Sequence, residues 1–251
     1  MQQQLREKDA NLKQLQQQLE QQIRENSLVL FSRAECREFT VVLPPPKTND
    51  AFLSFFSDLQ NRLSNVEDKT IYARQVILDP NTAQPRIALS ADNTSISTSE
   101  EIQNVPDHPS RFDVVPAVLG TNGFSTGRQY WEVSVAGKPS YQLGRASESA
   151  QRKGSMVFSP TNGFWTLVMN KQGQLIAVNR KPFIIPFQTQ PLTLGILLDH
   201  KKGQISIYNA GARSHMYSFV GQRFTDKIYP FVNYCVEDVE SLTPIVLLCP
   251  G

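Results

Sequence analysis

Short segments in which apolar and polar residues alternate dominate the chain after residue 70. In residues 127–135, GRQYWEVSV, the side chains of Trp131, Val133 and Val135 would lie on one side of an extended chain, and those between them on the other. Such alternation predicts a strand with one buried face. The same texture predicts further strands at 72–78, 86–90, 95–98, 117–120, 141–146, 156–159, 163–169, 174–179, 192–199, 204–209, 215–219, 229–235 and 244–249.

Two pairs of these segments predict hairpins. Residues 163–178 form one hairpin with Lys171, Gln172 and Gly173 at its tip, and residues 192–209 form another that turns between His200 and Gly203. Turn residues, not long helices, separate the strands. The pattern therefore predicts a mainly β protein in which antiparallel sheets pack as a two-layer β-sandwich over residues 70–251.

The first 30 residues have a different pattern. Leu5, Leu12 and Leu19 recur every seven residues and Leu15 takes an intervening position, which are the a and d sites of a heptad. We predict a coiled-coil helix over residues 1–30 that pairs two copies in a homodimer; the alternative is a single solvated helix.

Residues 31–69 are predicted to be a linker. The three prolines at 44–46 form a stiff, extended spacer. A short amphipathic helix is expected at 48–65, where large apolar residues recur at helical spacing: Phe52, Phe55, Phe56, Leu59 and Leu63.

Composition and charge exclude several classes of function. A net charge of +2 gives no strong attraction to nucleic acid, and no apolar run approaches the ~18 residues of a membrane span. The first residues lack the apolar core of a signal peptide. The three cysteines form no C-x-x-C pair and are interpreted as reduced thiols; the alternative is that they bind zinc or form disulfides. We expect a cytoplasmic protein without metal or cofactor.

Several motifs occur in the order found in the PRY-SPRY family, which residues 70–250 resemble. Residues 76–96, VILDPNTAQPRIALSADNTSI, are similar to the PRY signature, and residues 105–135 are similar to the central block of the family. The segments YQLGRASESAQRKG, NGFWTL, GILLDHKKGQISIYNA and IYPF complete the set.

The resemblance implies a bent, concanavalin-like jelly roll that recognises proteins and has no cofactor. PRY-SPRY domains commonly follow a coiled coil in tripartite-motif (TRIM) ubiquitin ligases, and they also occur in the cytoplasmic tails of butyrophilins. The resemblance therefore implies the recognition part of a TRIM-type ligase or of a butyrophilin-type immune regulator, which in the second case would lie beneath a membrane.

The family's variable loops and concave face also imply a protein-binding site. The positions that match them are Tyr141, Gln142, Arg145, Val168, Asn170, Tyr234 and Val236. Exposed apolar and aromatic side chains on rigid strands are good anchors because fixing them costs little entropy. Ordinary packing within the sandwich is the alternative for each of them, and Trp165 is expected to belong to the core.

Two chemical functions are alternatives to protein binding. Some butyrophilins sense small phosphorylated ligands, but Val115, Gln142 and Val157 stand where the basic groups of that pocket would align, so only Arg145 and Arg180 remain to bind an anion. Residues 123–127, GFSTG, fit the nucleophile elbow of a hydrolase with Ser125 as nucleophile. A strand instead of a helix is expected to follow, which argues against catalysis and favours a loop.

Overall fold

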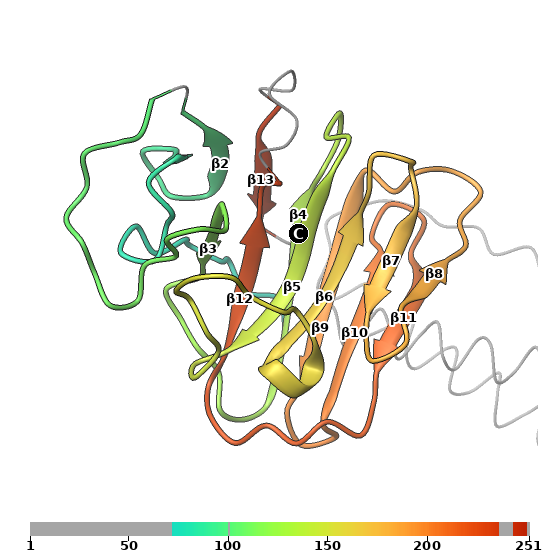
Figure 1. Cartoon of the computed structure of the whole chain (residues 1–251). Coiled ribbons are helices and arrows are strands. Elements are labelled where there is room, and N and C mark those ends of the chain that lie inside the picture. Colours follow the sequence, from blue (N-terminus) through green and yellow to red (C-terminus); the bar gives the residue numbers. More distant parts are fainter. Residues whose placement is uncertain (1–71, 100, 236–242, 250–251) are drawn as a thin grey trace, which may run out of the picture. The chain divides into compact units, whose positions relative to one another are not determined.

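A computed structural model describes residues 72–99, 101–235 and 243–249. These residues form two antiparallel sheets that lie face to face, as Figure 1 shows. The seven-stranded sheet has the order β1-β2-β13-β4-β9-β10-β11, and the six-stranded sheet has the order β3-β12-β5-β6-β7-β8. The predicted mainly β, antiparallel two-layer sandwich is therefore confirmed.

The strands are short, and turns of four or five residues join β1–β2, β6–β7, β7–β8, β9–β10 and β10–β11. The seven-stranded sheet consists of β1 (Ile87–Leu89), β2 (Ser95–Thr98), β13 (Ile245–Leu248), β4 (Arg128–Ser134), β9 (Thr193–Asp199), β10 (Gln204–Asn209) and β11 (Ser214–Phe219). The six-stranded sheet consists of β3 (Ala117–Leu119), β12 (Ile228–Asn233), β5 (Tyr141–Ser147), β6 (Phe164–Met169), β7 (Leu175–Val178) and β8 (Phe183–Ile185). The described residues contain one short 3-10 helix, η1 (Pro160–Asn162).

The main core fills the space between the sheets. Trp131 and Val133 of β4 face this space and are almost completely buried, as the alternation in that segment predicts. Trp165 of β6 also belongs to this core. Packing of the two inner faces against each other stabilises the sandwich, because it removes apolar surface from water and the stabilisation is proportional to the area removed.

A second apolar cluster covers part of the opposite, outer face of the six-stranded sheet. Phe164 and Phe231 lie 5.5 Å apart between ring centroids, and Phe158 packs edge-on against Phe164 at 4.9 Å. Met156 also packs against this cluster. The loop that follows β5 thus folds back over one end of the outer face and shields its aromatic residues.

Two of the predicted segments do not form strands, and one strand was not predicted. Residues 72–78 make only isolated bridges, at Ala73 and Leu78. Residues 156–159 alternate because they cover the aromatic cluster, not because they join a ladder. Strand β8 was not predicted, since three residues after Pro182 are too short a segment to show alternation.

The predicted coiled-coil helix at 1–30 and the linker with its amphipathic helix at 31–69 lie outside the described residues. Both therefore remain predictions.

Candidate functional site

Strand pairing places five side chains in one line across the outer face of the six-stranded sheet. Asn233 of β12 is opposite Gln142 of β5, which is opposite Val168 of β6; Ile176 of β7 and Ile184 of β8 continue the line. Directly opposed residues on neighbouring strands point to the same face. We call these five residues the cross-strand row.

The β12 and β5 end of the row is polar and internally hydrogen-bonded. Asn233 Nδ2 donates to Gln142 Oε1 at 3.0 Å, and Gln142 Nε2 donates to Thr166 Oγ1 at 2.9 Å. The backbone N–H of Cys235 donates to Asn233 Oδ1 at 3.0 Å. Gln142, Thr166 and Asn233 are all buried, so this network fixes their rotamers.

The other end of the row is apolar and accessible. Val168 and Ile176 are half-buried, whereas Ile184 on the edge strand is 55% exposed. Val178, one pair further along β7, is also half-buried on this side of the sheet. Rigid strands hold these side chains, so burying them against a partner removes apolar area at a small entropy cost.

Three of the predicted site residues face the core and not the surface. Tyr141 and Arg145 alternate with Gln142 along β5, so they point between the sheets, and both are fully buried. Tyr234 is also buried, and its hydroxyl donates to the carbonyl oxygen of Thr243 at 2.8 Å. The expectation that these three side chains are exposed anchors is corrected.

The remaining predicted residues divide between the row and its surroundings. Gln142 and Val168 belong to the row. Asn170 lies in the β6–β7 turn, where its side chain accepts from the Gln174 backbone N–H at 2.8 Å and donates to Gln174 Oε1 at 3.0 Å. Val236 lies outside the described residues. Contact between any of these positions and a partner stays a prediction.

Sequence reasoning missed Ile176, Ile184, Thr166 and Asn233. Alternation in residues 174–179 was visible and could have placed Ile176 on one face of a strand. The register that brings it beside Val168 could not be seen in the sequence, and the position of Ile184 depended on a strand that was not predicted.

The residues considered for an anion pocket do not converge on this face. Arg145 points to the interior, and Arg180 is exposed in the connection between β7 and β8. Val115 is half-buried against the aromatic cluster, and Val157 is 71% exposed. The row itself carries no charged side chain.

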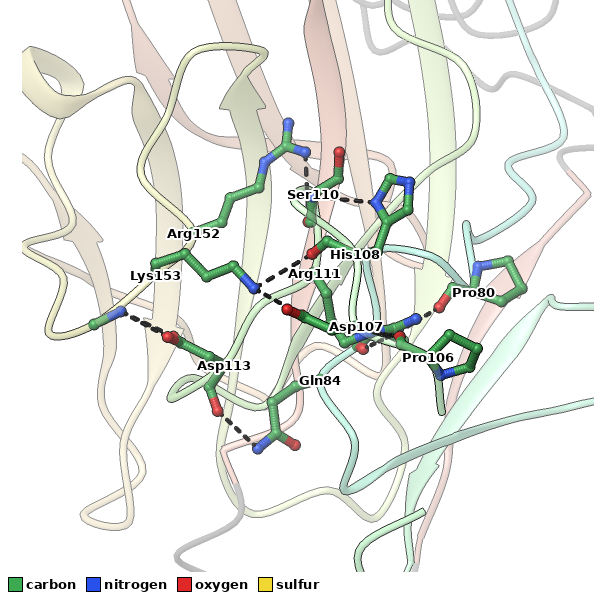
Figure 2. Close-up of polar contacts among 12 residues, drawn as sticks. Pro80, Gln84, Pro106, Asp107, His108, Ser110, Arg111, Asp113, Arg152 and Lys153 are labelled. Atoms are coloured by element: carbon green, nitrogen blue, oxygen red, sulfur yellow. Dashed lines mark hydrogen bonds and ion pairs between the residues drawn. The ribbon is translucent and has the colours of Figure 1, made fainter. Parts of the chain in front are cut away.

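A set of polar contacts joins two loops beside the aromatic cluster (Figure 2). Lys153 Nζ lies 3.3 Å from the Asp107 carboxylate and donates to the His108 carbonyl oxygen at 3.3 Å. The backbone N–H of Gly154 donates to both carboxylate oxygens of Asp113, at 2.9 and 3.1 Å. The hydrogen bond and positive charge of Lys153 lower the pKa of Asp107. We call these contacts the polar clasp.

Arg111 anchors the loop that contributes one side of the clasp. Its side chain is buried and donates to three backbone carbonyls: Nε to Pro106 at 3.1 Å, and Nη1 to Pro80 at 2.8 Å and to Ala83 at 2.7 Å (Figure 2). Next to it, Phe112 packs into the aromatic cluster. Arg111 therefore joins segments more than 20 residues apart and fixes the covered end of the outer face.

The possible hydrolase elbow is a loop. Ser125 is exposed, and the chain passes through Gly127 directly into β4, with no helix after the serine. The ring of His200 packs against Phe224 at 5.2 Å, and within the described residues no histidine ring is hydrogen-bonded to Ser125. This geometry lacks the strand–turn–helix arrangement that exposes a nucleophile in such enzymes.

Family models match most of the sandwich. A model described as the SPRY-associated domain, PRY, matches residues 76–124, and the SPRY domain model matches residues 128–243. The chain therefore belongs to the PRY-SPRY family, and the resemblance stated from its motifs is confirmed.

Curated relatives come from several classes of protein. The chain is 37% identical over 179 residues to pyrin from Homo sapiens, covering 71% of this chain and 23% of pyrin. It is 38% identical to butyrophilin subfamily 2 member A2 from Homo sapiens, covering 72% of this chain and 34% of that protein. It is 37% identical to E3 ubiquitin-protein ligase TRIM69 from Mus musculus, covering 70% and 35% respectively. The match spans about a third or less of each relative.

Solved structures agree with the fold. The TRIM65 PSpry domain superposes with a TM-score of 0.58 at 19% identity, covering 82% of this chain and 99% of that one. Stonustoxin superposes with a TM-score of 0.59 at 28% identity, covering 70% and 29%. Among the residues that the structure describes, no helix is long and apolar enough to cross a membrane, and no group of three or more His, Cys, Asp or Glu residues could hold a metal ion.

Proposed function

We propose that this PRY-SPRY domain is a non-catalytic module that binds a protein partner through the apolar end of the cross-strand row. The observation that carries the proposal is the line of Val168, Ile176 and Ile184, which is partly exposed on three adjacent strands. Homology to TRIM and butyrophilin SPRY domains supports a role in protein interaction.

The partner is expected to present apolar side chains to this line. The neighbouring Gln142–Thr166–Asn233 network uses its hydrogen-bonding groups internally, so it contributes a rigid floor more than new hydrogen bonds. A partner that buries Ile184 fully would remove about half of that side chain's surface from water, and the more enclosed Ile176 would lie nearer the centre of the contact.

The test compares two exposed aliphatic positions. A photo-reactive amino acid at position 184 is expected to capture a partner that the same group at position 220 does not capture, because Val220 is 64% exposed but lies outside the row. With the purified partner, Ile184→Lys is expected to weaken binding at least 10-fold by titration calorimetry, while Val220→Lys leaves it unchanged. Equal binding by both variants would place the contact elsewhere.

We propose that the domain selects the partner in the cytoplasm, either for a TRIM-type ubiquitin ligase or for a butyrophilin-type regulator, and that residues 1–30 pair two copies so that two weak contacts act together. The full-length transcript distinguishes the two settings: zinc-ligand cysteines upstream indicate a ligase, and an apolar span indicates a butyrophilin. Light scattering of the chain with and without residues 1–30 tests the pairing.

A small anionic ligand is the second candidate function. It is less well supported, because Arg145 does not reach the outer face and the row is uncharged.

A further inference from the structure

Arg145 is a cation enclosed in the apolar interior of the sandwich. Its side chain is fully buried, and its guanidinium carbon lies 5.7 Å from the ring centroid of Phe124 and 5.9 Å from that of Trp131. On the neighbouring strand it is opposite Trp165. Aromatic faces attract a cation, but they provide no hydrogen-bond acceptors in the plane of the guanidinium group.

The hydrogen-bonding capacity of this guanidinium is mostly unused. Nη2 donates to the backbone carbonyl oxygen of Gln129 at 3.2 Å, whereas the buried Nε and Nη1 have no hydrogen-bond partner among the described residues. Arg145 takes part in neither of the ion pairs that the described residues form, Arg128–Asp199 and Lys153–Asp107. Burial lowers the pKa of Arg145 to about 9, so the group is still positively charged at neutral pH. A buried charge without an opposite charge is strongly unfavourable.

Neighbouring groups add a further unused donor. The indole Nε1 of Trp131 is buried and has no acceptor within the part of the chain that the structure describes, and this group can only donate. Gln129 Oε1 is likewise buried and unpartnered. Gln129 and Trp131 are two residues apart on β4, so both side chains point between the sheets, and the Trp131 ring lies next to Arg145. The donors here outnumber the acceptors, and the net charge of the site is positive.

We propose that the interior of the sandwich binds one small monovalent anion of chloride size, held by N–H groups of Arg145 and by the indole N–H of Trp131. A single-atom ion accepts hydrogen bonds from several directions and balances one positive charge. A planar carboxylate or a phosphate would need more room among closely packed aromatic rings.

The site lies on the core side of β5, whereas Gln142 and the cross-strand row lie on the outer side. It is therefore independent of the proposed protein-binding face. The half-buried Phe124 covers Arg145 from a loop whose next two residues, Ser125 and Thr126, are exposed. Because Phe124 packs against the Arg145 guanidinium, binding of the anion would stabilise this loop as well as the sandwich.

Thermal unfolding of the full chain in sodium chloride and in sodium gluconate, at equal ionic strength, tests the proposal. Gluconate is too large for the site. Chloride is expected to raise the midpoint for the wild type, and well above the dissociation constant each 10-fold increase in chloride should lower the unfolding constant 10-fold. Arg145→Met is expected to abolish the chloride-specific response, and Arg180→Met, which changes an exposed arginine, to retain it.

Two further measurements make the outcome independent of how well Arg145→Met folds. Trp131→Phe removes only the indole donor and is expected to shift the chloride response to higher concentration. A crystal grown in sodium bromide should give an anomalous peak in contact with the Arg145 guanidinium. Identical behaviour of the wild type in chloride and gluconate, an unchanged response in Trp131→Phe, or no bromide peak at Arg145 would each overturn the proposal.

Discussion

Gln142 is expected to stabilise the domain through its two neighbours, and the change Gln142→Leu tests this. Leucine has a similar size but makes no hydrogen bonds. The substitution would leave Asn233 Nδ2 and Thr166 Oγ1 without their present partners on a buried part of the outer face. The loss of stability should therefore exceed the loss that an ordinary surface substitution causes.

The magnitude follows from the number of polar groups left unpaired. Each buried polar group that loses its partner costs about 1–3 kcal/mol. With two such groups, partly offset by the added apolar surface of leucine, Gln142→Leu should lower the free energy of unfolding by about 3 kcal/mol. Thr166→Val leaves only Gln142 Nε2 unpaired and should cost about 1–2 kcal/mol.

The double mutant gives the sharper test. Once Gln142→Leu is present, the Thr166 hydroxyl is already unpaired, so Thr166→Val removes a buried polar group that has no partner. The second substitution should then stabilise the protein, and its effect reverses in sign between the two backgrounds.

Urea unfolding followed by tryptophan fluorescence measures these effects. The chain has two tryptophans, and both lie in the core of the sandwich, so the signal reports on this domain. If Thr166→Val were equally destabilising in the wild-type and Gln142→Leu backgrounds, the hydrogen-bonded network would not be the source of the stability.

Three other substitutions test polar contacts outside the cross-strand row. Arg111→Met should lower the free energy of unfolding by about 3 kcal/mol, because three backbone carbonyls lose their donor. Lys153→Met breaks an exposed ion pair and should lower that free energy much less, so similar urea midpoints for the two variants would contradict this interpretation. Burial raises the pKa of Asp226, but hydrogen bonds from Ser147 (2.5 Å) and Ser149 (2.9 Å) outweigh burial and leave that pKa below its ordinary value. The stability that Asp226 contributes is therefore present above the ordinary carboxyl pKa and is lost as pH falls through the lowered pKa. In urea unfolding, the free energy of unfolding of Asp226→Asn should therefore decrease less than that of the wild type between about pH 5 and pH 2. A wild-type-like loss in Asp226→Asn would show that other carboxyl groups dominate.

The sequence predicts the sandwich well because many of its strands show the alternation that one buried face requires. Alternation in β4 correctly places Trp131 and Val133 in the core, and glycine-containing turns correctly mark the β6–β7 and β9–β10 hairpins. Gly173 and Gly203 have positive φ angles of 73° and 61°, which explains why glycine suits both turns.

The candidate site is harder to predict because β5 is buried on both faces. All seven of its residues are buried, and a polar side chain lies on each face: Gln142 outward and Arg145 inward. Hydrophobicity therefore gives no indication of which side of this strand meets the surface. The row also depends on pairing between strands, and no local pattern encodes the register that aligns Ile184 with Ile176 and Val168.

The position of β13 has a consequence for biosynthesis. Residues 245–248 are last in chain order among the strands, yet they insert between β2 and β4 and join the β1–β2 hairpin to the rest of the seven-stranded sheet. Until these residues leave the ribosome, two strand edges stay unpaired and open to aggregation. A premature stop codon before residue 245 should therefore yield a chain that chaperones retain and proteases degrade, even though nearly all of the domain has been translated.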